Sequence, residues 1–347
     1  MSWHPLALSH SVLLDSAVAP STLRTYTKNL DQFLTHTRRT LPQLLRMRSR
    51  EIDYRLSEYI DHLYAHHCPF ESASHALNGL VYRLPHLKQK LGQSRLRLRG
   101  WRRTKHSTSH PPLTWELTVL LAITMAQAGH HGEAVACLVA FDCYLSVGEL
   151  TRLTIDDVVR RNDARMGNSF TGMALRLAKT KTGLNQWVSV EDPDVEYVFA
   201  RWLRTRCAGR RPGFDPAREL VFPFSPAHFR HLMRRACDSL GVGATPYVPH
   251  SGSFRHGGAT ADFLRRRPIE DIMNRGRWRS MESARRYIQT GRALLAAQRV
   301  PAELNQDGAL FAQHLPFVMK HLMATVPLVP TRAPAGAAGR RVTFQHL

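Results

Sequence analysis

Residues 95–112 divide this sequence into two parts that can fold separately. The segment carries six positive charges between residues 95 and 105, contains one aromatic residue, Trp101, and ends in two prolines. A basic stretch that is poor in apolar residues and closed by prolines is typical of a linker. We therefore predict two domains joined by a basic linker at 95–112. Because of its charge, we expect this linker to cross a phosphate backbone rather than merely to lie in solvent.

The part before the linker repeats apolar residues at helical spacing. One run begins at Leu23, another at Ile52, and a third follows shortly after. Apolar residues that recur every three or four positions indicate amphipathic helices, and Ser21 is a suitable N-cap for the first of them. We predict a small all-helical domain at residues 20–94, preceded by an N-terminal extension at 1–19.

The part after the linker combines helices with two strands. Apolar runs at 115–128 and 133–144 predict helices. The alternation of residue types at 173–178 and 186–190 predicts two strands around a turn at 179–183. The further helices predicted here cover residues 193–205, 226–240, 253–266, 269–278 and 281–299.

The second domain, at residues 113–299, is therefore predicted to be mainly α with a small β-sheet. Asp192 is a suitable N-cap for the helix that follows the second strand. Residues 300–326 are predicted to form a C-terminal helical element that is broken near Pro316. Residues 327–347 are rich in Pro, Ala, Gly and Arg, which predicts a disordered basic tail.

The charge of the chain points to a polyanionic partner. The 48 Lys and Arg residues against 27 Asp and Glu give a formal net charge of +21, and most of the basic residues are arginine. The planar guanidinium group suits bidentate contact with phosphate. Charge alone does not separate a nucleic-acid-binding protein from another basic class, so the choice depends on motifs.

Several other classes receive no support from the sequence. It contains no apolar run of 18 residues and no signal-peptide layout at its start, so we expect a soluble intracellular protein without a membrane partner. The five cysteines form no CxxC pair, which predicts reduced thiols rather than a disulfide framework or a zinc site.

Four short segments of the second domain carry the residues of chemical interest. They are 141–150 (FDCYLSVGEL), 179–182 (KTKT), 249–260 (PHSGSFRHGGAT) and 276–288 (GRWRSMESARRYI). In this order, and behind a basic linker, they resemble the boxes of the tyrosine recombinases, or phage integrases. That family has Leu-Arg-x-x-Glu-Leu, His-x-x-Arg-His, and Gly-His/Trp followed nine residues later by Tyr. The third and fourth segments are most similar to the Crypton and DIRS-like eukaryotic mobile elements, and the resemblance covers residues 20 to about 300.

The resemblance implies a fold and a reaction. The fold is a two-domain clamp, with a helical core-binding domain and a mixed α/β catalytic domain around duplex DNA. In the reaction, a tyrosine hydroxyl attacks a DNA phosphodiester, which gives a 3′-phosphotyrosine and a free 5′-hydroxyl. Fixed cations stabilise the non-bridging oxygens, and a general acid protonates the leaving oxygen. The family needs no metal and no cofactor, so we expect none here.

The resemblance assigns a role to each matching residue. Tyr287, nine residues after Trp278, corresponds to the nucleophile, and Arg255 to the arginine that grips the scissile phosphate. Trp278 corresponds to the His/Trp position, whose N–H donates to a phosphate oxygen. His256 matches the histidine that follows the arginine, and we expect it to contact the catalytic residues rather than the phosphate itself.

The general acid of the family is a lysine on a β-hairpin, and two lysines match it. Lys181 is the residue that we favour. Lys179 is two positions away and would point to the same face of an extended strand, so it stays an alternative.

The first box departs from the family pattern. Ser146 stands where the family has an arginine, and Glu149, which supports that arginine in the family, is retained. A serine carries no charge, and Arg152 lies six residues further on, where a helix faces another way. The sequence therefore predicts impaired strand cleavage, which Ser146→Arg would restore at least in part.

The third box departs as well. Gly252 occupies the position of the family histidine, three residues before Arg255. If Gly252 and Ser253 are a two-residue insertion, His250 is the functional histidine. Whether His250 reaches the phosphate is left open by the sequence.

The resemblance also implies partners. We expect duplex DNA to be bound, the protein to self-associate as a dimer or tetramer on DNA, and the element at 300–326 to dock onto a neighbouring copy. The protein would then be found with DNA, in the nucleus if its host is eukaryotic. The basic residues that we expect to contact DNA are Arg99, Arg102, Arg103, Lys105, Lys179, Arg277 and Arg279.

Three functions remain open at this point. The leading interpretation is a site-specific recombinase or integrase. The altered first box equally fits a decayed, repurposed or deliberately substituted copy that binds DNA without cleaving it. The second interpretation is therefore a non-catalytic DNA-binding protein on the same scaffold. An unrelated RNA-binding protein comes third, since the sequence contains no RNP aromatic motif.

Overall fold

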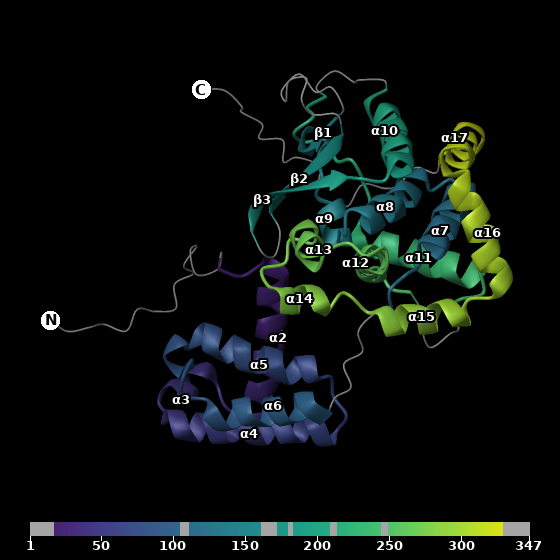
Figure 1. Ribbon diagram of the computed structural model, residues 1–347. Helices are drawn as coiled ribbons and strands as arrows, with labels where there is room; N and C mark the ends of the chain where they lie inside the picture. Colours follow the sequence, from purple (N-terminus) through teal and green to yellow (C-terminus); the bar gives the residue numbers. More distant parts are fainter. Residues whose placement is uncertain are drawn as a thin grey trace, which may run out of the picture. The chain divides into compact units, whose positions relative to one another are not determined.

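The chain forms two compact units, Met1–Thr108 and Ser109–Leu347, each with its own hydrophobic core (Figure 1). The structure is a computed structural model that describes residues 17–104, 111–160, 172–179, 183–208, 214–243 and 249–328. The prediction of a mainly α fold with one small sheet is confirmed. The described part contains no helix that is long and apolar enough to cross a membrane.

Unit 1 is all-helical, as its periodicity predicts. Its core includes Leu30, Phe33 and Ile60, all nearly inaccessible to solvent. The first helix begins at Pro20, where proline is favoured, and Ser21 is not its N-cap as predicted, because Ala19 holds that position. The helices of this unit are α2 (Pro20–Thr37), α3 (Leu41–Leu45), α4 (Ser49–Ala65), α5 (Phe70–Arg83) and α6 (Gly92–Thr104).

The prediction of a linker that starts at residue 95 is wrong, because helix α6 continues to Thr104. Its first turn is fixed by buried Asp53 of α4, whose carboxylate accepts hydrogen bonds of 2.9 Å from the backbone N–H groups of Gln93 and Ser94. These N–H groups have no acceptor within their own helix, so a carboxylate from a neighbouring helix serves as their cap. The remaining linker residues, 105–110, lie outside the described part.

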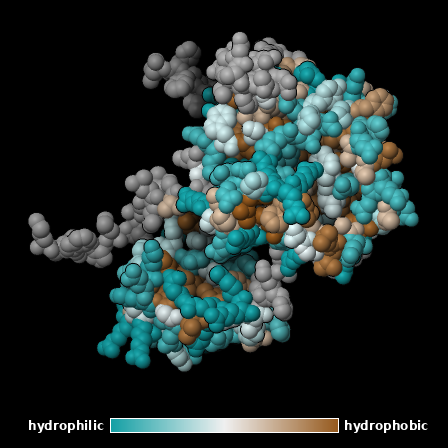
Figure 2. Space-filling view, in the orientation of Figure 1, coloured by the Kyte–Doolittle hydropathy of each residue, from teal (hydrophilic) through white to brown (hydrophobic). Residues whose placement is uncertain are grey.

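Most of the basic residues of α6 lie on its exposed side. Trp101 packs edge-on against Tyr64 and Phe70, so the linker's predicted aromatic residue belongs to the core side of unit 1. Arg99 and Arg103 are exposed, and hydrophilic residues cover much of the visible surface of this unit (Figure 2). The sequence pattern was therefore that of a basic surface helix.

Unit 2 is built around two helices that are buried on nearly every side. These are α7 (Trp115–Gln127) and α8 (His131–Asp142), which lie side by side (Figure 1). Around them pack α9 (Val147–Leu150), α10 (Pro193–Cys207), α11 (Pro226–Ser239) and α12 (Ser253–Leu264). Asp192 caps α10 as predicted, since its side chain accepts from the N–H groups of Asp194 and Val195.

The sheet of unit 2 is antiparallel, with strand order β1-β2-β3. Leu175 lies opposite Val188, which confirms the predicted pairing of the two alternating segments. The strands are β1 (Val158–Val159), β2 (Met173–Lys179) and β3 (Leu184–Val190).

Helix α12 approaches its neighbours closely through two glycines. A Cβ atom at Gly257 would lie 2.3 Å from the carbonyl oxygen of Leu113, and one at Gly258 would lie 2.1 Å from that of Phe141. Only glycine permits such an approach of two backbones. The contact fixes α12 against α8 and thereby fixes the start of α12, where Arg255 and His256 stand.

The helix predicted at 281–299 is broken. It forms α14 (Met281–Arg285) and α15 (Thr290–Arg299), and the hydroxyl of Thr260 bridges the break. This hydroxyl donates to the carbonyl oxygen of Tyr287 (3.2 Å) and accepts from the N–H of Gln289 (3.1 Å). Tyr287 therefore lies in a bend held by α12. The preceding helix, α13 (Ile269–Arg275), also ends before Trp278, earlier than predicted.

Two helices follow, with the predicted break close to Pro316. They are α16 (Ala302–Gln313) and α17 (Leu315–Thr325). Both pack on α7 of their own chain, and Leu315 and Met319 belong to the core of unit 2 (Figure 1). Docking of this element onto a neighbouring copy stays a prediction.

Candidate active site

Four aromatic rings stack in a row in unit 2. Tyr287 lies between His256 and Trp278, with ring centroids 4.6 and 4.5 Å apart, and Tyr144 lies on the far side of Trp278 at 6.1 Å. The rings are inclined by less than 30° to one another. They come from the end of α8, the start of α12, the loop after α13 and the break after α14. The fold thus brings three of the predicted segments together.

Arg255 lies across this stack. Its guanidinium carbon is 5.3 Å from the ring centroids of both Trp278 and Tyr287. One terminal nitrogen donates to the carbonyl oxygen of Gly276 (2.7 Å) and the other to Glu149 Oε2 (3.3 Å). The residues predicted as phosphate-gripping arginine and nucleophile are therefore neighbours.

Two hydrogen-bond donors in this cluster are open. Arg255 Nε and Trp278 Nε1 are both buried and have no hydrogen-bond partner among the described residues. A buried N–H group without an acceptor is costly, so such groups often mark a place where a ligand supplies the acceptor. Both side chains also contact the ring of Tyr287.

Ser146 has a structural role that the resemblance to the family did not predict. It is the N-cap of α9, and its hydroxyl and its backbone N–H both donate to Glu149 Oε2 at 2.7 Å. In return, the N–H of Glu149 donates to the Ser146 hydroxyl at 3.3 Å. This reciprocal capping box fixes the carboxylate of Glu149 toward Arg255.

Arg277 was predicted to contact DNA from the surface, and the structure corrects this. Its side chain is only 3% exposed. The guanidinium donates to the carbonyl oxygens of Cys143 (3.3 Å) and Tyr144 (3.1 Å) and lies 3.8 Å from Glu149 Oε1. Its backbone has φ = 57°, in the left-handed region that favours glycine. An arginine is thus inserted under the site at a position where its backbone is strained.

The charges of the site do not cancel. Burial raises the pKa of Glu149, but Arg255, Arg277 and the hydrogen bonds from Ser146 outweigh it, so that the pKa lies below its ordinary value. Burial lowers the pKa of Arg277 to about 10, against the attraction of Glu149, and the side chain still carries its charge at neutral pH. Two arginines and one carboxylate leave one net positive charge beside Tyr287.

His250 lies in the turn before α12. Its backbone N–H donates to the hydroxyl of Ser253 (2.9 Å), and its Nδ1 accepts from the backbone N–H of Gly252 (3.3 Å). Gly252 and Ser253, the two residues that we interpret as an insertion, therefore both contact His250. A role of His250 at the phosphate stays a prediction.

The remaining predicted residues fall on exposed or undescribed parts. Arg99, Arg102, Arg103 and Arg279 are exposed, as expected for residues that contact DNA. Lys105 and Lys181 lie outside the described residues, as does the side chain of Lys179, whose backbone ends β2. The choice between the two lysines therefore stays open.

The fold of this chain is similar to that of proteins whose structures have been solved. No protein-family model matches the sequence, and no curated protein matches it. Among solved structures, the Tn1549 transposon integrase in complex with transposon right-end DNA aligns over 81% of this chain and 99% of its own, at 12% identity and a TM-score of 0.50. The XerH site-specific recombinase bound to palindromic difH substrate aligns over 80% and 77%, at 14% identity and a TM-score of 0.48. The likeness to the integrase shows that this chain has the same fold.

Proposed function

We propose that this chain is a tyrosine recombinase, which breaks and rejoins duplex DNA through a covalent bond between Tyr287 and a 3′-phosphate. One observation carries the proposal: Arg255 lies over the ring of Tyr287, and its buried Nε has no hydrogen-bond partner among the described residues. The fold shared with an integrase that was solved on DNA supports it. The wording of the third and fourth boxes favours a mobile-element origin of the Crypton or DIRS-like kind.

The reaction assigns a function to each part of the cluster. The Tyr287 oxygen bonds to phosphorus while the hydroxyl proton passes to a water molecule, and the bond from phosphorus to the 5′ oxygen breaks. The 5′ oxygen takes a proton from a lysine of the hairpin, Lys181 or Lys179. Arg255 and Trp278 donate to the non-bridging oxygens through the two donors that are open in the structure. His250 is the further donor that we propose from the turn before α12.

We infer that Arg277 compensates for the arginine missing at Ser146. In the tyrosine recombinases, glycine directly precedes the His/Trp residue of the fourth box, and here that position is Arg277, with a left-handed backbone. Its guanidinium pairs with Glu149, the residue that in the family supports the first-box arginine. A guanidinium group from the fourth box therefore pairs with the Glu149 carboxylate, which the first-box arginine contacts in the family. Because its side chain is buried, Arg277 acts as a positioning residue and not through contact with DNA.

The proposal that the protein binds DNA rests on its net charge of +21 and on the exposed arginines of helix α6. We propose that Arg99, Arg102 and Arg103 contact phosphates, since they are exposed on a helix whose other side is packed on the core of unit 1. Self-association is part of the proposal. Exposed apolar side chains on α15 and α17, Leu294 and Phe317 among them, support a surface that a second copy covers.

A non-catalytic DNA-binding protein is the second candidate. The ring of Tyr287 is stacked on both sides, so packing alone accounts for the presence of an aromatic residue there. One experiment separates the two functions. The protein is incubated with a pool of nicked duplexes of random sequence, in which the short strand released by cleavage diffuses away and traps the covalent state. Complexes that survive SDS support the recombinase, whereas DNA retention without any SDS-resistant complex supports the second candidate.

A further inference from the structure

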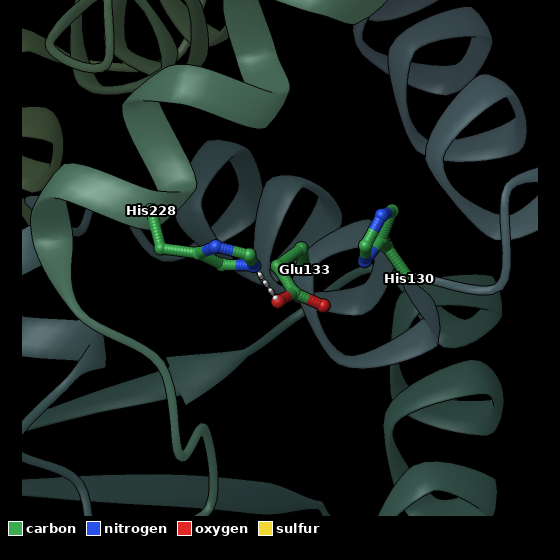
Figure 3. A group of neighbouring side chains, drawn as sticks. All are labelled: His130, Glu133 and His228. Atoms are coloured by element: carbon green, nitrogen blue, oxygen red, sulfur yellow. Dashed lines mark hydrogen bonds and ion pairs between the residues drawn. The ribbon is translucent and has the colours of Figure 1, made fainter. Parts of the chain in front are cut away.

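Three potential metal ligands meet on unit 2, away from the aromatic stack. They are His130 and Glu133 at the start of α8 and His228 in the first turn of α11 (Figure 3). One ligand atom from each lies within 4.8 Å of the others. In Figure 3 the carboxylate of Glu133 lies between the two imidazole rings. The sequence did not reveal this group, because 95 residues separate Glu133 from His228.

The backbone holds these side chains in place. Gly129 has φ = 80°, and the N–H of His130 donates to the carbonyl oxygen of Met125 at 2.9 Å, which closes the end of α7 in a Schellman-type turn. On the other helix, the hydroxyl of Ser225 accepts from the N–H of His228 at 3.1 Å and caps α11. Both histidines therefore stand at fixed helix starts, and little backbone freedom is lost when they bind a ligand.

The group has unused binding capacity. Glu133 is 3% exposed, and its Oε1 is 3.0 Å from Nε2 of His228. His130 Nδ1 is buried and has no hydrogen-bond partner in the described part of the chain. A buried carboxylate needs a positive partner, and a buried ring nitrogen needs a donor or an acceptor. A cation between the three residues would satisfy both.

We propose that His130, Glu133 and His228 bind a zinc ion. Two imidazole nitrogens and one carboxylate oxygen form a ligand set that Zn²⁺ prefers, with a water molecule as the fourth ligand. Ligand atoms around tetrahedral zinc lie roughly 3.4 Å apart. The contact between His228 and Glu133 is already close to that value, and the ligand atoms of all three residues lie within 4.8 Å of one another.

The surroundings allow a cation to enter. His130 lines a surface cavity of about 220 Å³ together with Arg235, which gives the ion a path from solvent. Arg235 opposes the approach of a cation, and the negative charge of Glu133 offsets it. The ion would tie α11 to the turn between α7 and α8, so that its role is to stabilise unit 2 rather than to take part in DNA cleavage. The proposal is therefore independent of the function of Tyr287.

The test uses the untagged full-length chain, freed of metal and titrated with Zn²⁺ in a calorimeter. We expect about one ion per chain and a higher Tm in its presence. His130→Asn and His228→Asn each should weaken zinc binding by more than about tenfold. The matched control is His231→Asn, an exposed histidine one turn further along α11, which should bind zinc as the unchanged protein does. Circular dichroism without metal establishes that each variant is folded, and Glu133→Gln serves if one of them is not.

The competing site is a stack of three histidines in unit 1, formed by His36, His62 and His66. Loss of zinc binding in His62→Asn, with binding retained in His228→Asn, would overturn the proposal. A wild-type protein that binds no zinc would overturn it as well. Zinc binding that fails only in the variants of His130, Glu133 and His228 is the result that we expect.

Discussion

The guanidinium group of Arg277 lies 3.8 Å from the carboxylate of Glu149, whose other oxygen accepts from both Ser146 and Arg255. A residue of the fourth segment thus reaches the helix start of the first. If Arg277 positions Glu149 and through it Arg255, Arg277→Gly should lower the yield of covalent adduct by roughly tenfold, which corresponds to about 1.4 kcal/mol of lost transition-state stabilisation. The same change also relieves the left-handed backbone, so stability gives a separate readout. The adduct yield of Arg277→Gly should therefore fall without a matching fall in its Tm.

A double-mutant cycle tests the exchange of positions. From the sequence alone we expected Ser146→Arg to restore cleavage, and the contacts reverse this expectation. Ser146→Arg alone removes the cap of α9 and places a third guanidinium at a single carboxylate, so it should lower the adduct yield. Combined with Arg277→Gly it recreates the family arrangement and should recover activity. The measurement is adduct yield for the four proteins. A gain from Ser146→Arg alone would mean that the position is vacant and not compensated.

The identity of the general acid can be decided with a modified leaving group. Lys181→Ala should lose cleavage of ordinary DNA but retain it on DNA whose 5′ bridging oxygen is replaced by sulfur, because a thiolate leaves without a proton. Lys179→Ala is the matched control on the same hairpin and should cleave both substrates. The reverse pattern would assign the acid to Lys179.

The pKa of Glu149 predicts a dependence of stability on pH. Because its folded pKa lies below the ordinary value of 4.5, the ionised form stabilises the fold above that pH, and the contribution is lost as the pH falls through the folded pKa. Glu149→Gln should therefore lower the free energy of unfolding at neutral pH, and its difference from wild type should shrink in acid. Denaturant unfolding across this range measures it. Glu282→Gln, an exposed residue that pairs only with Arg286 among the contacts described, should show no such convergence.

Neutralising the exposed arginines of α6 should weaken DNA binding and should also make the affinity less dependent on salt concentration. Arg99, Arg102 and Arg103 changed to Gln remove up to three phosphate contacts, which lowers the slope of log K against log salt by about 2–3. Arg97→Gln on the same helix is the control, because Arg97 is already paired with Asp61 at 2.6 Å. An equal slope in the triple variant and the control would show that α6 does not contact DNA.

Local signals predicted most of the fold. Helical periodicity located α4, α5, α7 and α8, and alternation located β2 and β3, since these patterns depend on one buried face. The start of helix α6 could not be predicted from the local sequence, because its capping residue, Asp53, belongs to another helix. The break between α14 and α15 was hidden for the same reason, since it depends on the hydroxyl of Thr260. Contacts between residues far apart in the chain leave no periodic trace.

The candidate site was predictable in its residues but not in its surroundings. The resemblance to the tyrosine-recombinase boxes pointed to Arg255, Trp278 and Tyr287, and the structure places them in contact. The burial of Arg277 could not be predicted, because an arginine in a short segment rich in basic residues resembles a surface residue. The pairing of Arg277 with Glu149 appears only once the loop after α13 lies beside the side chain of Glu149.

Mass spectrometry of the trapped complex locates the covalent bond between the protein and DNA. The SDS-resistant complex is digested with protease and nuclease, and the modified peptide is sequenced. We expect a nucleotide on Tyr287 and no adduct from Tyr287→Phe. This variant keeps the ring between His256 and Trp278 and should bind DNA as wild type does. An adduct on another residue, or an undiminished adduct yield from Tyr287→Phe, would contradict this expectation.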